Sequence, residues 1–126
     1  MPHREVLGSV DLTSFHRGFE ARALHEERLV SKLLSAFLST DGNALIVEAM
    51  VVEGHLRQGF FLLATTKDGT AMVRVHPRSA PEKTPGVKRT VSWLAAWLGH
   101  RTGDAAVGKT NLEASALAAF PDDAIR

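Results

Sequence analysis

The sequence contains no cysteine. Without thiols the chain cannot form disulfides, use a cysteine nucleophile or build the common cysteine-ligated zinc sites. The same absence fits a reducing compartment, so a cytoplasmic location is expected. Folding must therefore depend on an apolar core rather than on covalent or metal cross-links.

Neither sign of charge dominates the chain, which has 15 basic and 14 acidic residues and a formal net charge of +1. No strong global field attracts it to nucleic acid, anionic lipid or acidic substrates, so such a partner would need a local patch. No stretch approaches the roughly 18 consecutive apolar residues of a membrane span. The mixed sequence after Met1–Glu5 also predicts no secretory signal.

The composition is that of an ordinary globular protein, with 44% hydrophobic and 23% charged residues in 126 positions. A chain of this length buries roughly two-thirds of its unfolded surface as one domain. A single core domain over residues 1–100 is predicted, followed by a loosely attached linker and short helix over residues 101–126.

The first third of the chain is predicted to contain a short strand and a long helix. Glu5–Leu12 has some strand character, weakened by Gly8. From Asp11 to about Leu38 the spacing of apolar residues indicates an amphipathic helix. The positions that carry this pattern are Phe15, Phe19, Ala23, Val30, Leu33 and Phe37.

Three strands are predicted next, at residues 44–53, 56–66 and 70–76, because these runs are rich in β-branched and apolar residues. The Asp68-Gly69 pair favours a tight hairpin between the second and third strands. Residues 44–53 are apolar on both faces, which requires two covering layers. One layer is expected to be a helix and the other a second helix or another copy of the chain.

A second helix is predicted over Val87–Leu98. Trp93 and Trp97 lie one turn apart on this helix, and core packing is the default interpretation of both. Because other residues already form the apolar stripe, the alternative is that the two tryptophans lie at its edge as interface residues. Thr110 to Glu113 fits a capping box that begins a short helix. The predicted fold class is α+β, a three- or four-stranded antiparallel sheet in the order (β)-α-β-β-β-α-α.

One octapeptide matches a phosphate-binding pattern. Gly103, Gly108, Lys109 and Thr110 occupy the glycine, lysine and hydroxyl positions of a phosphate loop. The segment resembles the corresponding loop of small Ras-like GTPases, which implies phosphate or nucleotide binding. However, the preceding segment has helical rather than strand periodicity, and no acidic-ended strand follows. A linker before a capped helix is the favoured interpretation, with phosphate binding as an alternative.

A second resemblance concerns the order helix, three strands, helix over residues 20–99. Together with Lys88-Arg89 and Ala95-Ala96, this order resembles the double-stranded-RNA-binding domain. The resemblance implies that basic residues of the loop and helix start contact phosphates across a groove. These residues would be Arg78, Lys83, Lys88 and Arg89. The alternative interpretation is a solvated basic loop.

Catalytic and metal-binding patterns are weak. The six histidines lack metal-ligand spacing, so no metal or cofactor is expected. Glu48 interrupts an apolar strand face and is expected to pair with Arg57 or Arg74 rather than act as a base. The favoured function is a non-enzymatic binding or assembly module that forms a homodimer, with a further protein partner possible and nucleic acid not favoured.

Overall fold

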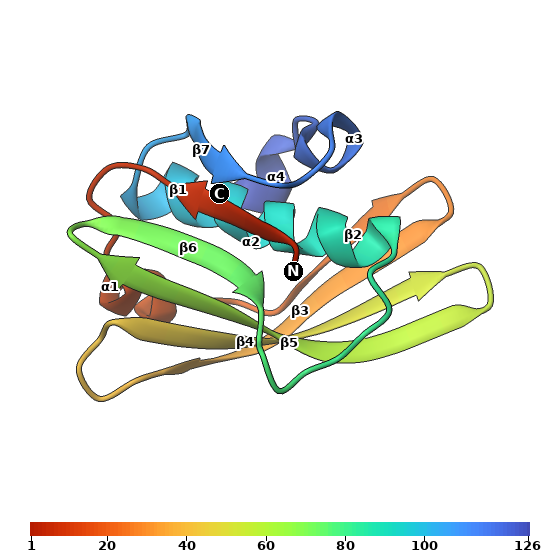
Figure 1. Cartoon of the computed structure of the whole chain (residues 1–126), viewed down its shortest axis with the longest axis horizontal. Helices are drawn as coiled ribbons and strands as arrows, with labels where there is room; N and C mark the ends of the chain where they lie inside the picture. The colour runs from red at the N-terminus through yellow and green to blue at the C-terminus, as the bar shows by residue number, and fades with distance from the viewer.

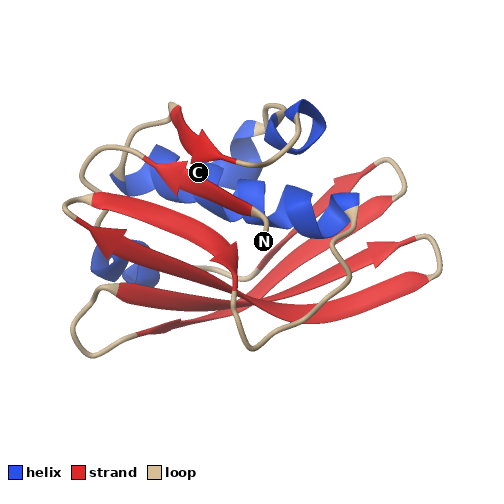
Figure 2. Ribbon diagram, in the orientation of Figure 1, coloured by secondary structure: helices blue, strands red, loops and turns tan.

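One antiparallel sheet of seven strands curves around a central helix in the computed structural model, which describes residues 1–126 (Figures 1 and 2). The strand order is β2-β3-β4-β5-β6-β1-β7. The strands are β1 (His3–Val6), β2 (Arg22–Glu26), β3 (Leu29–Leu38), β4 (Ala44–Glu53), β5 (Leu56–Lys67), β6 (Thr70–Val75) and β7 (Val107–Thr110). The helices are α1 (Leu12–Arg17), α2 (Pro85–Thr102), α3 (Ala114–Leu117) and α4 (Asp122–Ile125). The general α+β class is retained, but the prediction of a three- or four-stranded sheet is wrong.

The centre of the sheet follows the sequence pattern. The strands β4, β5 and β6 form the predicted meander, with β5 as the middle strand of the seven. Asp68 and Gly69 both have positive φ, 54° and 86°, which gives the β5–β6 hairpin the turn that matches strand twist. In the β3–β4 turn, the carboxylate of Asp41 accepts hydrogen bonds from the Asn43 amide and the Ser39 hydroxyl.

The predicted long helix to Leu38 is wrong. Only α1 is helical there, and β2 and β3 form a hairpin at one edge of the sheet. Its turn contains Arg28 with a φ of 61°, a conformation usually signalled by glycine or asparagine. The sequence therefore has no recognisable turn signal between two strands.

A register shift in β3 explains the false helical period. Leu33 pairs with Ala49, whereas Ala36 pairs with Val47, so Leu34 is the extra residue. The shift places inward-facing apolar residues three positions apart instead of two. Three-residue spacing is a helical signature, which accounts for the wrong prediction.

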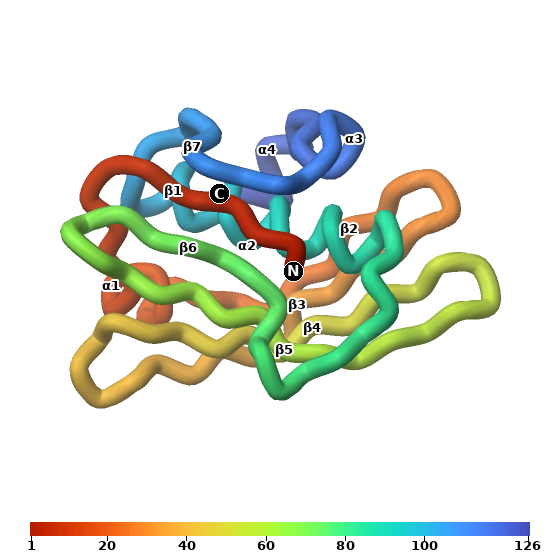
Figure 3. Tube along the Cα trace, in the orientation of Figure 1, coloured from red at the N-terminus to blue at the C-terminus, as the bar shows by residue number.

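The first strand of the chain, β1, is an internal strand of the sheet and not an edge strand. β1 pairs with β6 on one side and with β7 on the other, as the trace in Figure 3 shows. The segment predicted as a linker thus contains an edge strand. Gly103 has a packing role, because a Cβ atom there would lie 2.8 Å from the carbonyl oxygen of Leu7.

The helix predicted at Val87–Leu98 is confirmed within α2, which lies across one face of the sheet (Figure 1). Thr84 is its N-cap, and the Glu53 carboxylate accepts hydrogen bonds from the Thr84 hydroxyl and from the Gly86 amide, the latter at 3.0 Å. A carboxylate at a helix N-terminus is favoured by the helix dipole. β4 therefore fixes the start of α2 on what we call the inner face.

The core fills the space between α2 and the inner face. Trp93 and Trp97, the candidate interface residues, are both fully buried there. The Trp93 indole donates to the carbonyl oxygen of Ala124 at 2.7 Å, and Trp97 contacts Phe15 with ring centroids 4.8 Å apart. None of the four helices combines the length and apolar character that crossing a lipid bilayer requires.

Candidate functional site

The opposite side of the sheet carries no helix. We call it the outer face (Figure 2). Along β4 and β5, buried inner residues alternate with partly exposed ones that point outward. Many of the outward residues of the sheet are apolar. The side chains of Phe37 on β3 and Phe61 on β5 are 57% and 42% exposed. The large apolar side chains of the outer face are Val30, Phe37, Ile46, Met50, Val52, Phe61, Leu63 and Met72.

Glu48 lies within this apolar surface, opposite Phe61 on β5 and Ser35 on β3. Its Oε1 accepts a hydrogen bond from the Ser35 hydroxyl at 2.9 Å, and it forms no ion pair within the chain. The expected pairing with Arg57 or Arg74 is thus not formed.

Arg74 is the basic counterpart of Glu48 on the other side of β5. It lies opposite Leu63, and its Nε is buried without a hydrogen-bond partner. The outer face therefore holds an acid and a base whose charges the chain itself leaves unpaired. Lys32 and Arg57 add two further positive charges to the same face.

The acidic residues of β4 do not converge on a catalytic site. Glu48 is on the outer face, whereas Glu53 caps α2 on the inner face, and His55 is exposed in the β4–β5 turn. No group of three or more His, Asp or Glu side chains is arranged to hold a metal ion. The hydroxyls of Ser35 and Thr84 donate to Glu48 and Glu53 respectively, but the two hydroxyl–carboxylate pairs lie on opposite faces of the sheet.

The phosphate-loop residues are arranged differently from a loop that surrounds an anion. Gly108, Lys109 and Thr110 form part of the edge strand β7. The Lys109 amide donates to a carboxylate oxygen of Glu5 at 3.2 Å, and the Thr110 hydroxyl donates to the carbonyl oxygen of His3 at 2.7 Å. Because a carboxylate already faces this strand, the geometry gives no support to an anion site at Gly103–Thr110.

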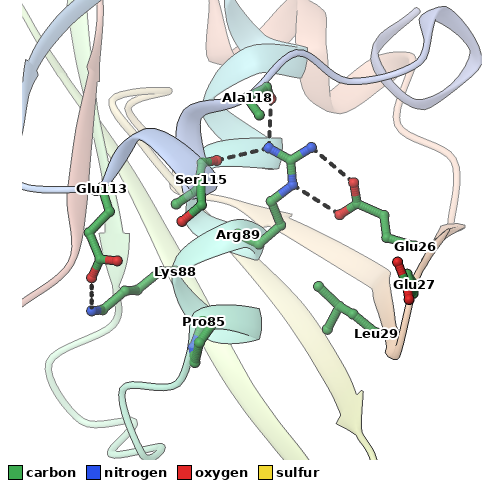
Figure 4. Close-up of a pocket in the computed structure, with 10 residues that line it drawn as sticks. Glu26, Glu27, Leu29, Pro85, Lys88, Arg89, Glu113, Ser115 and Ala118 are labelled. Atoms are coloured by element: carbon green, nitrogen blue, oxygen red, sulfur yellow. Dashed lines mark hydrogen bonds and ion pairs between the residues drawn. The ribbon is translucent and has the colours of Figure 1, made fainter.

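The largest cavity, about 380 Å³, lies between the β2–β3 hairpin, the start of α2 and α3 (Figure 4). At its edge Arg89 is only 7% exposed. Arg89 donates two hydrogen bonds to the Glu26 carboxylate, at 2.9 and 3.0 Å. The central carbon of its planar guanidinium lies 3.7 Å from the Phe120 ring centre. It also donates to the carbonyl oxygens of Ala116, Ala118 and Ala119.

Arg89 therefore joins β2 and the C-terminal segment to α2, and all its donor groups are engaged. Lys88 next to it pairs with Glu113 at 2.9 Å. The predicted nucleic-acid residues are consequently not gathered on one free surface, because only Arg78 and Lys83 are exposed without an ion pair. Both basic residues that line this cavity are paired within the chain, and the unpaired charge in its lining is the exposed carboxylate of Glu27.

Two shifted pKa values have structural causes at the sheet periphery. Burial, together with the charge of Arg101, lowers the pKa of Arg22, whose guanidinium lies 3.8 Å from the Trp97 ring centre. The hydrogen bond from the Asn43 amide, followed by that from Ser39, lowers the pKa of Asp41. Both groups stabilise local structure, Arg22 by holding the C-terminal carbonyls and Asp41 by ordering a turn.

Comparison with family models, curated proteins and solved structures gives no significant match. Function therefore has to be inferred from the surfaces of the chain itself. Sequence reasoning identified the two-sided apolar strand β4, but it placed Phe37 on a helix and Arg89 at a phosphate-contacting surface, and it did not single out Phe61 or Arg4. The signal for Phe61 was available, because it is the outward residue between the inward Phe60 and Leu62 on β5.

Proposed function

We propose that the protein is a non-enzymatic assembly module in which the outer faces of two copies stack to form a homodimer. The observation that carries the proposal is the uncovered outer face, with Phe37 and Phe61 about half exposed. Soluble monomers rarely expose contiguous apolar patches larger than a few hundred Å². Stacking of two copies would bury this uncovered apolar surface.

The size of the outer face suits a dimer. Strands β3 to β6 are spaced by about 4.8 Å and average roughly ten residues in length, at about 3.3 Å per residue, which gives about 600 Å² of flat area. Side-chain relief increases the accessible area, so the face approaches the roughly 800 Å² per partner of a standard interface. Two such faces can stack about 10 Å apart, as in other sheet-on-sheet packings.

Charge complementarity favours a second copy as the occupant. A two-fold axis along β5 would lay β4 of one copy over β6 of the other. Glu48 is level with Phe61, and Arg74 is level with Leu63, so the two lie on opposite sides of β5 with an offset of two residues along it. This offset, about 7 Å, is within reach of a glutamate and an arginine side chain.

Stacking would therefore pair Glu48 of each copy with Arg74 of the other. Each pair meets a requirement that the single chain leaves unmet, because buried charges need partners. Gly59 helps the approach: no atom lies within 4 Å of where its Cβ would be, so the centre of the face is flat enough to receive a facing side chain.

The first test measures mass in solution by sedimentation equilibrium. At about 100 µM, well above the Kd expected of an interface of standard size, the chain should have twice its monomer mass of 13.7 kDa. Phe61→Glu should give the monomer mass. Val107→Glu is the matched control, because Val107 is 43% exposed but lies on β7, away from the outer face. A monomeric wild type, or equal effects of both variants, would overturn the proposal.

Charge reversal tests the arrangement of the two copies. Glu48→Arg and Arg74→Glu each place like charges together across the proposed interface and should weaken association at least tenfold. The double variant restores both pairs with the charges exchanged, so dimerisation should return to within a few-fold of wild type. Failure of the double variant to recover would reject the Glu48–Arg74 pairing.

A further inference from the structure

A second cavity, of about 290 Å³, lies on the opposite side of the molecule from the outer face, between α2, β7 and the C-terminal helices. We call it the Arg4 groove. Its walls are apolar apart from Arg4 and His100, and its larger apolar residues are Val107, Leu117, Phe120 and Ile125. It is distinct from the cavity beside Arg89 and shares no lining residue with the outer face.

Arg4 is 6% exposed, yet no carboxylate lies within ion-pair distance of it. Its Nη1 donates to Ser92, at 2.8 Å to the hydroxyl and 3.1 Å to the carbonyl oxygen. A guanidinium has five N–H donors, and within the chain only Nη1 of Arg4 forms hydrogen bonds. Nε and Nη2 are not among the fully buried side-chain atoms without a partner, so they remain open to solvent at the groove. This contrasts with Arg89, whose charge is neutralised by Glu26.

The surroundings of Arg4 make a negatively charged ligand favourable. Burial, and then the positive charge of Arg89, lowers the pKa of Arg4, and no acidic residue offsets these effects. An uncompensated and largely buried charge is costly, so an anion that pairs with it is favoured.

One stripe of α2 forms the floor of the groove. Ser92, Ala96 and His100 are spaced by four residues and therefore share a side of the helix. Ser92 holds Arg4 at one end, and His100 is exposed at the other. Ala96 lies between them, and its small side chain leaves the space that a larger residue would fill.

We propose that the Arg4 groove binds a small carboxylate with an apolar body, the carboxylate pairing with Arg4 and the apolar part lying against Val107, Leu117 and Phe120. A carboxylate matches the planar guanidinium in two hydrogen bonds. The apolar walls disfavour a polyphosphate or a highly hydroxylated ligand. Since a 150 Å³ cavity can hold benzene, about 290 Å³ suits a ligand of about a dozen non-hydrogen atoms.

The test is a calorimetric titration of the full chain with octanoate, accompanied by amide chemical shifts. Octanoate should bind one site per chain with a Kd of about 0.1–1 mM, a modest affinity for ten or so non-hydrogen atoms. The shifts should cluster on residues 96–107 and 117–125. Octanamide, which has the same chain but no charge, should bind at least tenfold more weakly.

Two variants separate the charge from the space. Arg4→Gln removes the charge and should weaken octanoate binding at least tenfold while leaving octanamide binding unchanged. Ala96→Leu keeps Arg4 but fills the groove, so it should abolish binding of both compounds even if Arg4→Gln proves poorly folded. Phe61→Glu, on the outer face, should bind octanoate as wild type does, which separates this site from the proposed dimer.

The inference is overturned by any of four results. Octanoate and octanamide could bind equally, which would remove the role of Arg4. Shifts could map to the outer face instead of the groove. Ala96→Leu could bind octanoate as well as wild type, which would place the ligand elsewhere. No binding at about 10 mM octanoate would also reject it, because that is at least tenfold above the expected Kd.

Discussion

The inner and outer faces of the sheet come from the same strands but differ in what covers them. On β5, Phe60, Leu62 and Ala64 point inward and are buried in the core, whereas Phe61 and Leu63 point outward. Both sets are apolar, so composition alone does not distinguish them. The difference is that the chain provides a helical layer for one face only.

A strand that is apolar on both faces therefore need not be buried on both faces within one chain. The inner face contributes to the stability of the monomer, and the outer face is available for association. Its polar groups agree with this division, because the inner carboxylate of Glu53 has partners on α2, whereas Glu48 has only the Ser35 hydroxyl.

The largest effect should come from neighbouring leucines on β5. Leu62→Ala removes a fully buried side chain and should lower the free energy of unfolding by about 4 kcal/mol. Leu63→Ala, measured by urea unfolding at a concentration low enough to populate monomers, should cost less than about 1 kcal/mol. Equal losses in the two variants would mean that the outer face is covered within the chain.

Arg89 and Lys88 are adjacent residues of α2 whose polar contacts should contribute differently to the free energy of unfolding. Arg89→Met leaves Glu26 and three carbonyl oxygens without their donor and should destabilise the chain by about 3 kcal/mol. Lys88→Met breaks an ion pair with an exposed glutamate and should cost under about 0.5 kcal/mol. Urea midpoints that shift equally would contradict this ranking.

Two glycines give the smallest contrast between the faces. At Gly86 a Cβ would lie 2.5 Å from the Glu53 carboxylate, so Gly86→Ala should displace the α2 cap and cost about 1 kcal/mol. At Gly59 on the outer face the space is open, so Gly59→Ala should be neutral or stabilise the monomer by up to about 0.5 kcal/mol. Thermal unfolding at low protein concentration measures both. A destabilised Gly59→Ala monomer would show that something packs over this position.

Local patterns were sufficient for the middle of the fold. Strands β4 to β6 alternate regularly and have a strong turn at Asp68-Gly69, and α2 keeps a helical period. The β2–β3 hairpin could not be predicted in this way, because Arg28 hides the turn and the shift at Leu34 breaks the alternation. β7 pairs with β1 from the far end of the sequence, and no local signal reports such a contact.

The candidate sites were predictable to the extent that they depend on alternation. The sequence of β4 itself shows that its outer side is apolar. A second covering layer was expected for this reason. Trp93 and Trp97 remained candidates for an interface because the segments that bury them, including Phe15 and Ala124, were not recognised as neighbours. The Arg4 groove needs five elements in place at once, so the sequence gives no hint of it.

The position of β1 between β6 and β7 has a consequence for synthesis on the ribosome. His3–Val6 is synthesised before both of its hydrogen-bonding neighbours, which are complete only when Val75 and Thr110 have been made. For several seconds at ordinary translation rates, this strand therefore has both edges open, while the hairpin of β2 and β3 and the meander of β4 to β6 can already form. The sheet is complete only after β7 has been synthesised.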